Sequence, residues 1–313
     1  MMREGSLAYV TVASVDVERT AHVLSVHFGL PRSLHLPDAK APPIPLYAVG
    51  ETALAVVPIG DPFINGDTRP GVHHVVFASE DPESAAAQAA TRLDCKVATA
   101  EPGLDGATRF ALPPAATEGV KVYFSKPVSM DRSRGGCRHV ERIDHLGIVS
   151  ADTQRAIDVF HRRLGLTLES QQVDVETLLP FESFTSDKYG IVQHNREPVF
   201  CGGVRSAFIT AGDCELEFLQ DYSPLGPGEI DPQQAGTTRQ DRGAIARFLA
   251  SRGPGLAHIA FKTPSIADAL AEAKTAGCEL IDRVGRAGGR RSQIAFIHPR
   301  GMGGMLFHFV QRD

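Results

Sequence analysis

The chain repeats itself, and this repeat constrains its fold more than any other feature. In each half a strand-like segment leads into a helical stretch, and a glycine follows 20 residues after the central residue of the strand. Gly29 stands in this relation to Tyr9, and Gly165 to His145. Glycine is a good helix stop because it enters the left-handed backbone conformation freely. The strand-like segments are 7–12 and 143–149, and the helical stretches run from about 15 to 28 and from about 152 to 164.

The repeat continues through a second strand–helix pair and a final strand. The strand-like segment 71–77 parallels 255–261, and a helix is expected after each, over about 82–93 and 265–276. Tyr123 lies 49 residues after His74, and His308 lies 50 residues after His258. Such agreement indicates a duplication. Each half therefore predicts a pair of βαβββ units, an α+β fold in which helices cover one side of a curved, eight-stranded sheet.

This pattern divides the chain into domains at 1–124 and 139–313, joined by an exposed linker at 125–138 that is rich in Ser, Arg and Gly. The second half is longer because of two insertions, at about 171–203 and 221–240. Long insertions in a compact domain are usually either functional or disordered, so a lid or substrate wall and a disordered segment both remain open.

Composition excludes several classes of protein. Of the 313 residues 42% are hydrophobic and 22% charged, and the net charge is -5 without a basic run, so we expect no nucleic-acid partner. The five cysteines show no paired spacing, which fits a reducing cytoplasm better than a disulfide framework. No segment resembles a signal peptide or a membrane span. We therefore expect a cytoplasmic protein.

Four strand-like segments of the second half each carry one ligand-type residue among apolar neighbours. These residues are His145, Glu217, His258 and His308. Neutral imidazoles with a carboxylate suit Fe, Mn, Co, Ni or Zn, and the set does not choose among them. Glu215 lies two residues from Glu217 and faces the same side of a strand, so spacing alone does not decide between the two carboxylates.

Several segments resemble the vicinal oxygen chelate superfamily, which includes glyoxalase I and the extradiol dioxygenases. The segments 244–249, 252–261, 294–299 and 303–306 are similar to those of methylmalonyl-CoA epimerases. The resemblance implies two curved cups, each of eight strands. One divalent metal ion per chain is implied in the second cup, with His145, Glu217, His258 and His308 as ligands. The equivalent positions of the first half are Tyr9, Ala55, His74 and Tyr123, which predicts a degenerate, metal-free domain.

The departures from this family bear on catalysis. Epimerases and glyoxalase I carry a glutamate on the last strand, where this chain has His308, and the segment 200–202 lacks a second carboxylate. We therefore expect His308 to be a catalytic residue as well as a metal ligand. Tyr189 or His194, from the first insertion, is expected to act as the base. Arg286 or the pair Arg290–Arg291 could meet a substrate carboxylate or the phosphates of a CoA thioester, with an exposed basic loop as the alternative.

Three functions remain open. The first is a metal-dependent isomerase, epimerase or lyase that labilises a proton next to a carbonyl, in an acyl-CoA or a 2-oxo or 2-hydroxy acid. The second is a non-haem iron dioxygenase, because an inert first domain and an active second one resemble the extradiol and 4-hydroxyphenylpyruvate dioxygenases. The third is a non-catalytic small-molecule binding protein. All three functions predict a small-molecule ligand, which would carry adjacent oxygens if it binds the metal. A homo-oligomer is compatible with each of them.

Overall fold

The computed structural model describes residues 5–37, 41–130, 139–195, 197–222 and 243–312. The helices of the first half are α1 (Val17–His22), continued by the π-helical segment η1 (Val23–His27), and α2 (Pro82–Leu93), with short 3-10 turns η2 (Pro62–Ile64) and η3 (Pro114–Ala116). Its strands are β1 (Leu7–Ser14), β2 (Arg32–His35), β3 (Ile44–Val49), β4 (Thr52–Pro58), β5 (Gly71–Ala78), β6 (Glu101–Pro102), β7 (Thr108–Ala111) and β8 (Val122–Ser125).

The second half repeats this order with additions. Its helices are α3 (Thr153–Ala156), continued by the π-helical segment η4 (Ile157–Arg163), α4 (Ala244–Arg252) and α5 (Ile266–Thr275), with 3-10 turns η5 (Gly289–Arg291) and η6 (Pro299–Met302). Its strands are β9 (Arg142–Val149), β10 (Thr167–Leu178), β11 (Phe181–Ser186), β12 (Gly190–Asn195), β13 (Val199–Ala211), β14 (Cys214–Asp221), β15 (Gly255–Lys262), β16 (Arg286–Ala287), β17 (Gln293–Ile297) and β18 (Phe307–Gln311).

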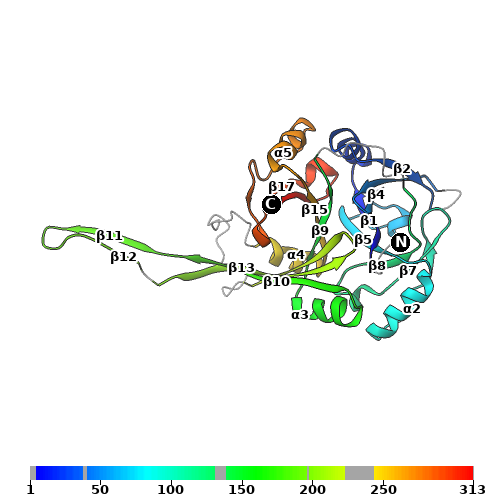
Figure 1. Ribbon diagram of the computed structural model, residues 1–313, viewed down its shortest axis with the longest axis horizontal. Coiled ribbons are helices and arrows are strands. Elements are labelled where there is room, and N and C mark those ends of the chain that lie inside the picture. The colour runs from blue at the N-terminus through cyan, green and yellow to red at the C-terminus, as the bar shows by residue number, and fades with distance from the viewer. Residues whose placement is uncertain (1–4, 38–40, 131–138, 196, 223–242, 313) are drawn as a thin grey trace.

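The two halves form matching eight-stranded sheets, as predicted (Figure 1). The order is β2-β3-β4-β1-β5-β8-β7-β6 in one and β10-β13-β14-β9-β15-β18-β17-β16 in the other, so corresponding strands hold corresponding places. In each sheet the two βαβββ units meet at an antiparallel pair, β1 with β5 and β9 with β15. The predicted α+β class and the duplication are confirmed.

The first helix of each half begins and ends for the same reasons. Asp16 and Asp152 are the N-caps, and the carboxylate of each accepts a hydrogen bond at 2.9 Å from a backbone N–H of the first turn. Gly29 and Gly165 follow with φ of +66° and +82°, the left-handed conformation predicted for them. The second part of both helices widens into a π-helix, a change of hydrogen-bond register that the spacing of apolar residues did not predict.

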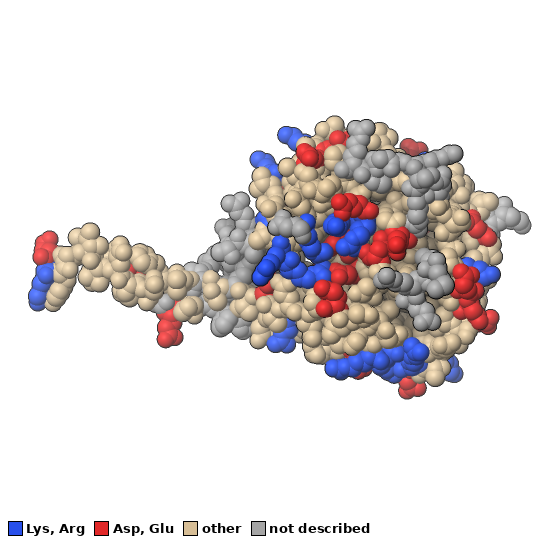
Figure 2. Space-filling model, in the orientation of Figure 1, with Lys and Arg blue, Asp and Glu red and all other residues tan. Residues whose placement is uncertain are grey.

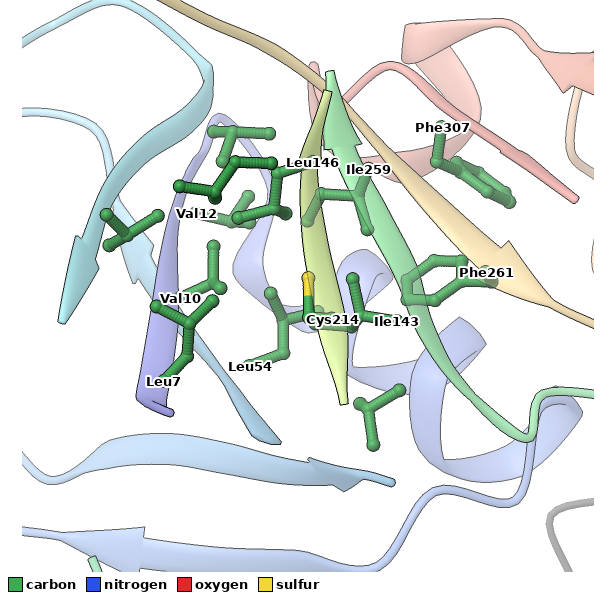
Figure 3. Close-up of a cluster of buried hydrophobic side chains, with 14 of the residues drawn as sticks. Leu7, Val10, Val12, Leu54, Ile143, Leu146, Cys214, Ile259, Phe261 and Phe307 are labelled. Carbon is green, nitrogen blue, oxygen red and sulfur yellow. The ribbon is translucent and has the colours of Figure 1, made fainter. Parts of the chain in front are cut away.

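One apolar core joins the two halves (Figure 3). Leu7 and Val12 of β1 belong to the same buried cluster as Leu146 of β9 and Ile259 and Phe261 of β15. All five side chains are 1% exposed or less. Either half alone would expose this shared surface to water, so the properties of either half are best measured on the full chain. The first sheet ends at Ser125, and residues 131–138 of the predicted linker lie outside the described residues.

Two glycines allow the halves to approach closely. A Cβ on Gly119 would lie 2.0 Å from the carbonyl oxygen of Pro254, and a Cβ on Gly304 would lie 2.4 Å from Cβ of Pro70. Both glycines also have a positive φ, +80° and +96°. Since Gly119 and Gly304 occupy equivalent places in the repeat, the contact between the halves is itself repeated.

The first insertion is an ordered ribbon of strands rather than a loop over the site. β10 and β13 pair antiparallel from Thr167–Thr210 outwards to Leu178–Val199, and the hairpin β11–β12 continues beyond them. Figure 1 shows this ribbon projecting away from the body. Most of the second insertion, residues 223–240, lies outside the described residues. Among the helices that the structure describes, none is both long and apolar enough to cross a membrane.

Candidate metal centre

Four neighbouring strands bring the predicted ligand residues onto one face of the second sheet. These strands are β14, β9, β15 and β18, in that order, and the residues are Glu217, His145, His258 and His308. Gly147 of β9 lies in register between Glu217 and His258. One step along the sheet, Ala260 of β15 lies between His145 and His308. The side chains of Glu217 and His258 therefore meet over Gly147, and those of His145 and His308 meet over Ala260.

The distances bring the four side chains into one cluster. One ring nitrogen from each of the three histidines lies within 4.8 Å of one from each of the others. Oε2 of Glu217 lies 3.0 Å from Nε2 of His145 and 4.0 Å from Nε2 of His258. The histidines are buried, with exposed fractions of 3% to 6%. The four side chains therefore direct donor atoms into one common space.

Each imidazole has a buried nitrogen without a hydrogen-bond partner among the described residues. These atoms are Nε2 of His145, Nε2 of His258 and Nδ1 of His308. Nε2 of His145 nevertheless lies 3.0 Å from Oε2 of Glu217, an ion pair when the ring is protonated. A buried nitrogen left unpaired costs about 1–3 kcal/mol, so the nitrogens of His258 and His308 call for a ligand that accepts their lone pairs, and a cation at the same place would compete with a proton on His145. A divalent transition-metal ion fits this donor set of three nitrogens and one carboxylate.

Asp144 holds the first of these imidazoles in position. Nδ1 of His145 donates to Oδ2 of Asp144 at 2.9 Å, which directs Nε2 of the same ring towards the cluster. Asp144 is fully buried and accepts two further bonds, at 2.7 Å from Arg312 and at 3.1 Å from Arg142. Oδ1 of Asp144 thus accepts from two guanidinium groups, while Oδ2 accepts from His145. This arrangement is the usual support of a metal-binding histidine.

Burial and charge set the protonation of the cluster. Burial lowers the pKa of His258 to about 4, and it also lowers the pKa of His308, so both rings are neutral at pH 7. Burial acts in the same direction on His145, but the carboxylates of Glu217 and Asp144 outweigh it and raise the pKa of His145 to about 9. Without a bound cation a proton is therefore held beside Glu217, in the place where a divalent ion would compete with it.

The structure gives the two carboxylates on β14 different partners. Glu215 accepts hydrogen bonds from Nη1 of Arg290, at 3.1 Å, and from Nη2 of the same side chain. The Arg290 guanidinium also lies 3.7 Å from the centre of the Phe208 ring. Glu215 is therefore paired with Arg290 in the wall of the cup, whereas Glu217 lies among the histidines.

Arg286 lies on the cup face beside the cluster. It pairs in register with Ile294 of β17, so the two side chains share a face. Its Nε donates to Asp282 at 3.0 Å, and its guanidinium lies 5.3 Å from the centre of the Phe296 ring, which in turn lies 4.3 Å from the ring of His308. Nη1 of Arg286 is buried and has no partner among the described residues. Nη1 of Arg286 can therefore donate a hydrogen bond to a bound ligand.

The first half has the same register with different side chains. Thr11 of β1 lies between Ala55 and His74, as Gly147 lies between Glu217 and His258. Val76 of β5 lies in register with Tyr9 and with Tyr123. The predicted correspondence of the two sets of positions is therefore confirmed. His74 is the only nitrogen ligand among its four members.

A guanidinium lies in this first cup. Arg109 is 1% exposed and lies between the rings of Phe63 and Tyr123, at 4.0 and 4.4 Å from their centres. Its Nη1 donates to Nε2 of His74 at 3.2 Å, and its Nη2 donates to Glu101 at 2.8 Å. Nε2 of His74 corresponds to Nε2 of His258, which has no hydrogen bond to the described residues. In the first cup this nitrogen instead accepts a hydrogen bond from the guanidinium of Arg109.

The structure does not bring Tyr189 or His194 to the cup of their own chain. Tyr189 lies in the turn of the projecting hairpin and is 67% exposed, and His194 of β12 pairs with Glu182 at 3.0 Å. The expectation that they act as base there is not met, because the insertion extends outwards as paired strands (Figure 1). Sequence reasoning also missed Asp144 and Gly147. Asp144 could have been found as an acid next to the candidate ligand His145. Gly147 could have been found as a glycine inside an apolar strand.

Comparisons with known proteins show what the second half is similar to. Residues 144–296 match the profile of the Glyoxalase/Bleomycin resistance/Dioxygenase superfamily. The protein YqjC of Bacillus subtilis (strain 168), itself uncharacterised, is 26% identical over 178 residues, which are 55% of this chain and 93% of YqjC.

Two solved structures are similar to this chain to different extents. Methylmalonyl-CoA epimerase from Mycobacterium tuberculosis is 22% identical, covers 57% of this chain and 92% of its own, and has a TM-score of 0.39. A mutant of 4-hydroxymandelate synthase from Streptomyces coelicolor is 13% identical, covers 100% of this chain and 94% of its own, and has a TM-score of 0.60. The second match extends the similarity in fold to both halves.

Proposed function

We propose that the second half of this chain, a Glyoxalase/Bleomycin resistance/Dioxygenase superfamily domain, is the active site of a divalent-metal-dependent isomerase, epimerase or lyase. The reaction labilises a proton next to a carbonyl in a small substrate with adjacent oxygens. A 2-oxo or 2-hydroxy acid meets this description, and so does an acyl-CoA that carries a carboxylate on the reacting carbon.

One observation carries the proposal. Three buried imidazole nitrogens that make no hydrogen bond to the described residues lie close to the carboxylate of Glu217, on four adjacent strands, and one of them forms an ion pair with it. His145, Glu217, His258 and His308 would hold the ion. When bound, a divalent ion supplies Lewis-acid stabilisation of the negative charge that develops on a carbonyl oxygen. With one carboxylate among the four ligands, the site keeps more positive charge than a site with two carboxylates.

The remaining residues of the cup bind and orient the substrate. Arg286 offers its unpaired Nη1 to an anionic group of the substrate, beside His308. We assign proton acceptance to Glu215, which lies in register with His145 and shares the cup face of Glu217. Arg290 fixes the orientation of this carboxylate through two hydrogen bonds. His258 and His308 suit the role of ligands better than that of bases, because burial lowers the pKa of both.

The test is proton exchange without oxygen. Metal-loaded protein is incubated in D₂O under argon with methylmalonyl-CoA or with 2-oxobutyrate, and deuterium at the carbon next to the carbonyl is followed by NMR. Exchange in the wild type that is lost in His258→Ala and in Glu215→Gln, with metal retained in Glu215→Gln, is the expected result. No exchange with any acyl-CoA or 2-oxo or 2-hydroxy acid would contradict the proposal.

The alternative enzyme is a non-haem iron dioxygenase. The likeness in fold to 4-hydroxymandelate synthase over both halves is compatible with it, but a fold shared at 13% identity does not carry an activity. An oxygen electrode separates the two. Turnover that requires both Fe²⁺ and dioxygen would replace the isomerase with the dioxygenase, and tight substrate binding without turnover would leave a binding protein.

A further inference from the structure

A serine, a histidine and an aspartate form a hydrogen-bonded chain in the first half. Oγ of Ser33 lies 2.6 Å from Nε2 of His35, and Nδ1 of His35 lies 2.5 Å from Oδ2 of Asp105. A carboxylate only accepts hydrogen bonds, so Nδ1 carries the proton, and Nε2 of the neutral ring has a free lone pair. The hydroxyl of Ser33 therefore donates to Nε2. This is the arrangement of an activated serine nucleophile.

The strand β2 and the turn between β6 and β7 hold the three side chains in place. Ser33 and His35 are two residues apart on β2, so both point to the same face. The backbone of Leu36 binds Asp105 twice: its N–H donates to Oδ1 at 3.3 Å, and its carbonyl accepts from the N–H of Asp105 at 2.7 Å. His35 is 6% exposed, and Ser33 is half-buried. The imidazole is thus fixed between its partners, while solvent reaches the serine.

The second cup joins the corresponding edges of its sheet without a histidine. Gln172 of β10 occupies the place of His35 of β2, since each follows a serine by two residues on corresponding outer strands. The amide oxygen of Gln172 accepts at 3.1 Å from the backbone N–H of Arg290, which lies between β16 and β17 as Asp105 lies between β6 and β7. A neutral amide thus performs the structural task, and this task alone does not require a serine–histidine–aspartate chain.

The backbone of β2 offers a hydrogen-bond donor next to the serine. β2 is the outermost strand of its sheet. The carbonyl of Pro31 accepts from the N–H of Ala48, and hydrogen-bonded pairs alternate along an antiparallel ladder, so the N–H of Leu34 points away from β3. This N–H makes no hydrogen bond to the described residues. It is available to the oxygen of a carbonyl that Ser33 attacks, where negative charge develops in the transition state.

We propose that Ser33, His35 and Asp105 form a second catalytic site, independent of metal, that hydrolyses small neutral carboxylic esters. Oγ of Ser33 bonds to the carbonyl carbon while its proton passes to Nε2 of His35. The bond from that carbon to the alkoxy oxygen then breaks, and the alcohol leaves with this proton. A water molecule, deprotonated by His35, attacks the acyl-serine, the carboxylic acid leaves, and Ser33 regains its proton. Asp105 fixes the tautomer of His35 throughout.

The surroundings of the serine favour a neutral substrate with an apolar acyl group. Ile44 and Leu46 of β3, which pair in register with His35 and Ser33, are both apolar and buried. Figure 2 shows acidic and basic side chains interspersed over the middle of the face that it presents, so the charge there has no single sign that would attract a charged ester. The p-nitrophenyl ester of a short acid is therefore a suitable probe.

The first test is the covalent labelling of the full chain by an alkyl fluorophosphonate in the presence of EDTA. An activated serine displaces fluoride and keeps the phosphonyl group. We expect about one equivalent of label on the tryptic peptide 33–40, in which Ser33 is the only residue with a hydroxyl group. Ser33→Ala should not be labelled on this peptide. Ser25→Ala, at a serine whose hydroxyl donates to the carbonyl of Ala21 at 2.6 Å, should be labelled like the wild type.

The second test separates catalysis from a structural role. His35→Gln recreates the arrangement of the second cup, so the free energy of unfolding in urea should stay close to that of the wild type. The same variant, and Asp105→Asn, should lower the rate of labelling and the kcat/KM for p-nitrophenyl acetate about 100-fold or more, the range of one general base. No label on peptide 33–40, labelling of His35→Gln as fast as that of the wild type, or ester hydrolysis undiminished in Ser33→Ala would overturn the proposal.

Discussion

A Cβ atom on Gly147 would lie 2.0 Å from Cε1 of His258 and 2.2 Å from its Nε2. The imidazole of His258 thus occupies the space in which any other residue at 147 would have its side chain. Gly147 lies in register between Glu217 and His258, so its missing side chain lets both reach the same point. The first half has Thr11 at this place, where Thr11 instead shares a hydrogen bond of 2.9 Å with His74.

Gly147→Ala should therefore displace His258 and weaken metal binding. We expect the metal dissociation constant to rise about 10–100-fold, the range typical when a ligand is mispositioned, while the circular dichroism spectrum stays unchanged. Competition with a fluorescent chelator measures the constant. Gly289→Ala is the matched control, since its nearest neighbour is the flexible side-chain oxygen of Gln172 at 3.3 Å. Equal constants for Gly147→Ala and the wild type would show that His258 is not a ligand.

Arg109→Met should destabilise the protein without changing its metal content. The guanidinium donates to His74 and Glu101 in a buried site, and removing one member of such a pair costs about 3 kcal/mol or more. Urea unfolding measures the loss, with the exposed Arg162→Met as control. A variant that loses its metal along with its stability would show that the first half takes part in metal binding.

The stability of the protein should fall in mild acid, in part because of His73. Burial, with Lys121 and Arg109 adding to it and Asp67 opposing it, lowers the pKa of His73 to about 3 from the ordinary 6.5. Between these pH values the unfolded chain binds the extra proton, so the free energy of unfolding decreases as the pH falls. The contribution of one such group is at most about 1.4 kcal/mol per pH unit.

Urea titrations at pH 7, 6 and 5 in the presence of a chelator test this sign. His73→Asn should flatten the dependence of unfolding free energy on pH, and His22→Asn, at an exposed histidine, should not. A slope that is the same in all three proteins would mean that His73 does not titrate on unfolding.

Arg286→Gln should weaken the binding of anionic ligands and leave the metal in place. Malonomonohydroxamate and acetohydroxamate share a chelating group with adjacent oxygens and differ by one carboxylate. Calorimetry on the metal-loaded wild type should show a preference of about tenfold or more for the first, as expected for one charge-assisted hydrogen bond. The preference should vanish in Arg286→Gln and persist in Arg291→Gln, whose side chain is exposed. Its persistence in both variants would assign the carboxylate to another residue.

The sequence predicts the sheets and the cluster well because both follow from local periodicity. His145, His258 and His308 each stand alone among apolar residues on a strand, and the duplication sets their strands in corresponding places. What joins them is the register between strands, which no local pattern encodes. Gly147 and Ala260 become necessary only when the neighbours across the sheet are known.

The insertion and the first cup were not predictable in the same way. Residues 181–195 contain β-formers and turn residues that are also typical of an irregular loop, and their outward course depends on pairing of β10 with β13. Arg109 lies on the short strand β7, and nothing near it in the sequence indicates that its guanidinium is buried between Phe63 and Tyr123. The partners of a buried charge come from distant segments, so the structure is needed to find them.

The most direct test of the metal centre is the metal content of the full chain, measured by inductively coupled plasma mass spectrometry after loading with Mn²⁺, Fe²⁺, Co²⁺, Ni²⁺ or Zn²⁺ and exhaustive desalting. The account predicts about one equivalent per chain for at least one of these ions, and a loss of about tenfold or more in the variant His145→Ala/His258→Ala/His308→Ala. A folded wild-type protein that retains none of the five ions, or a triple variant that retains as much metal as the wild type, would contradict it.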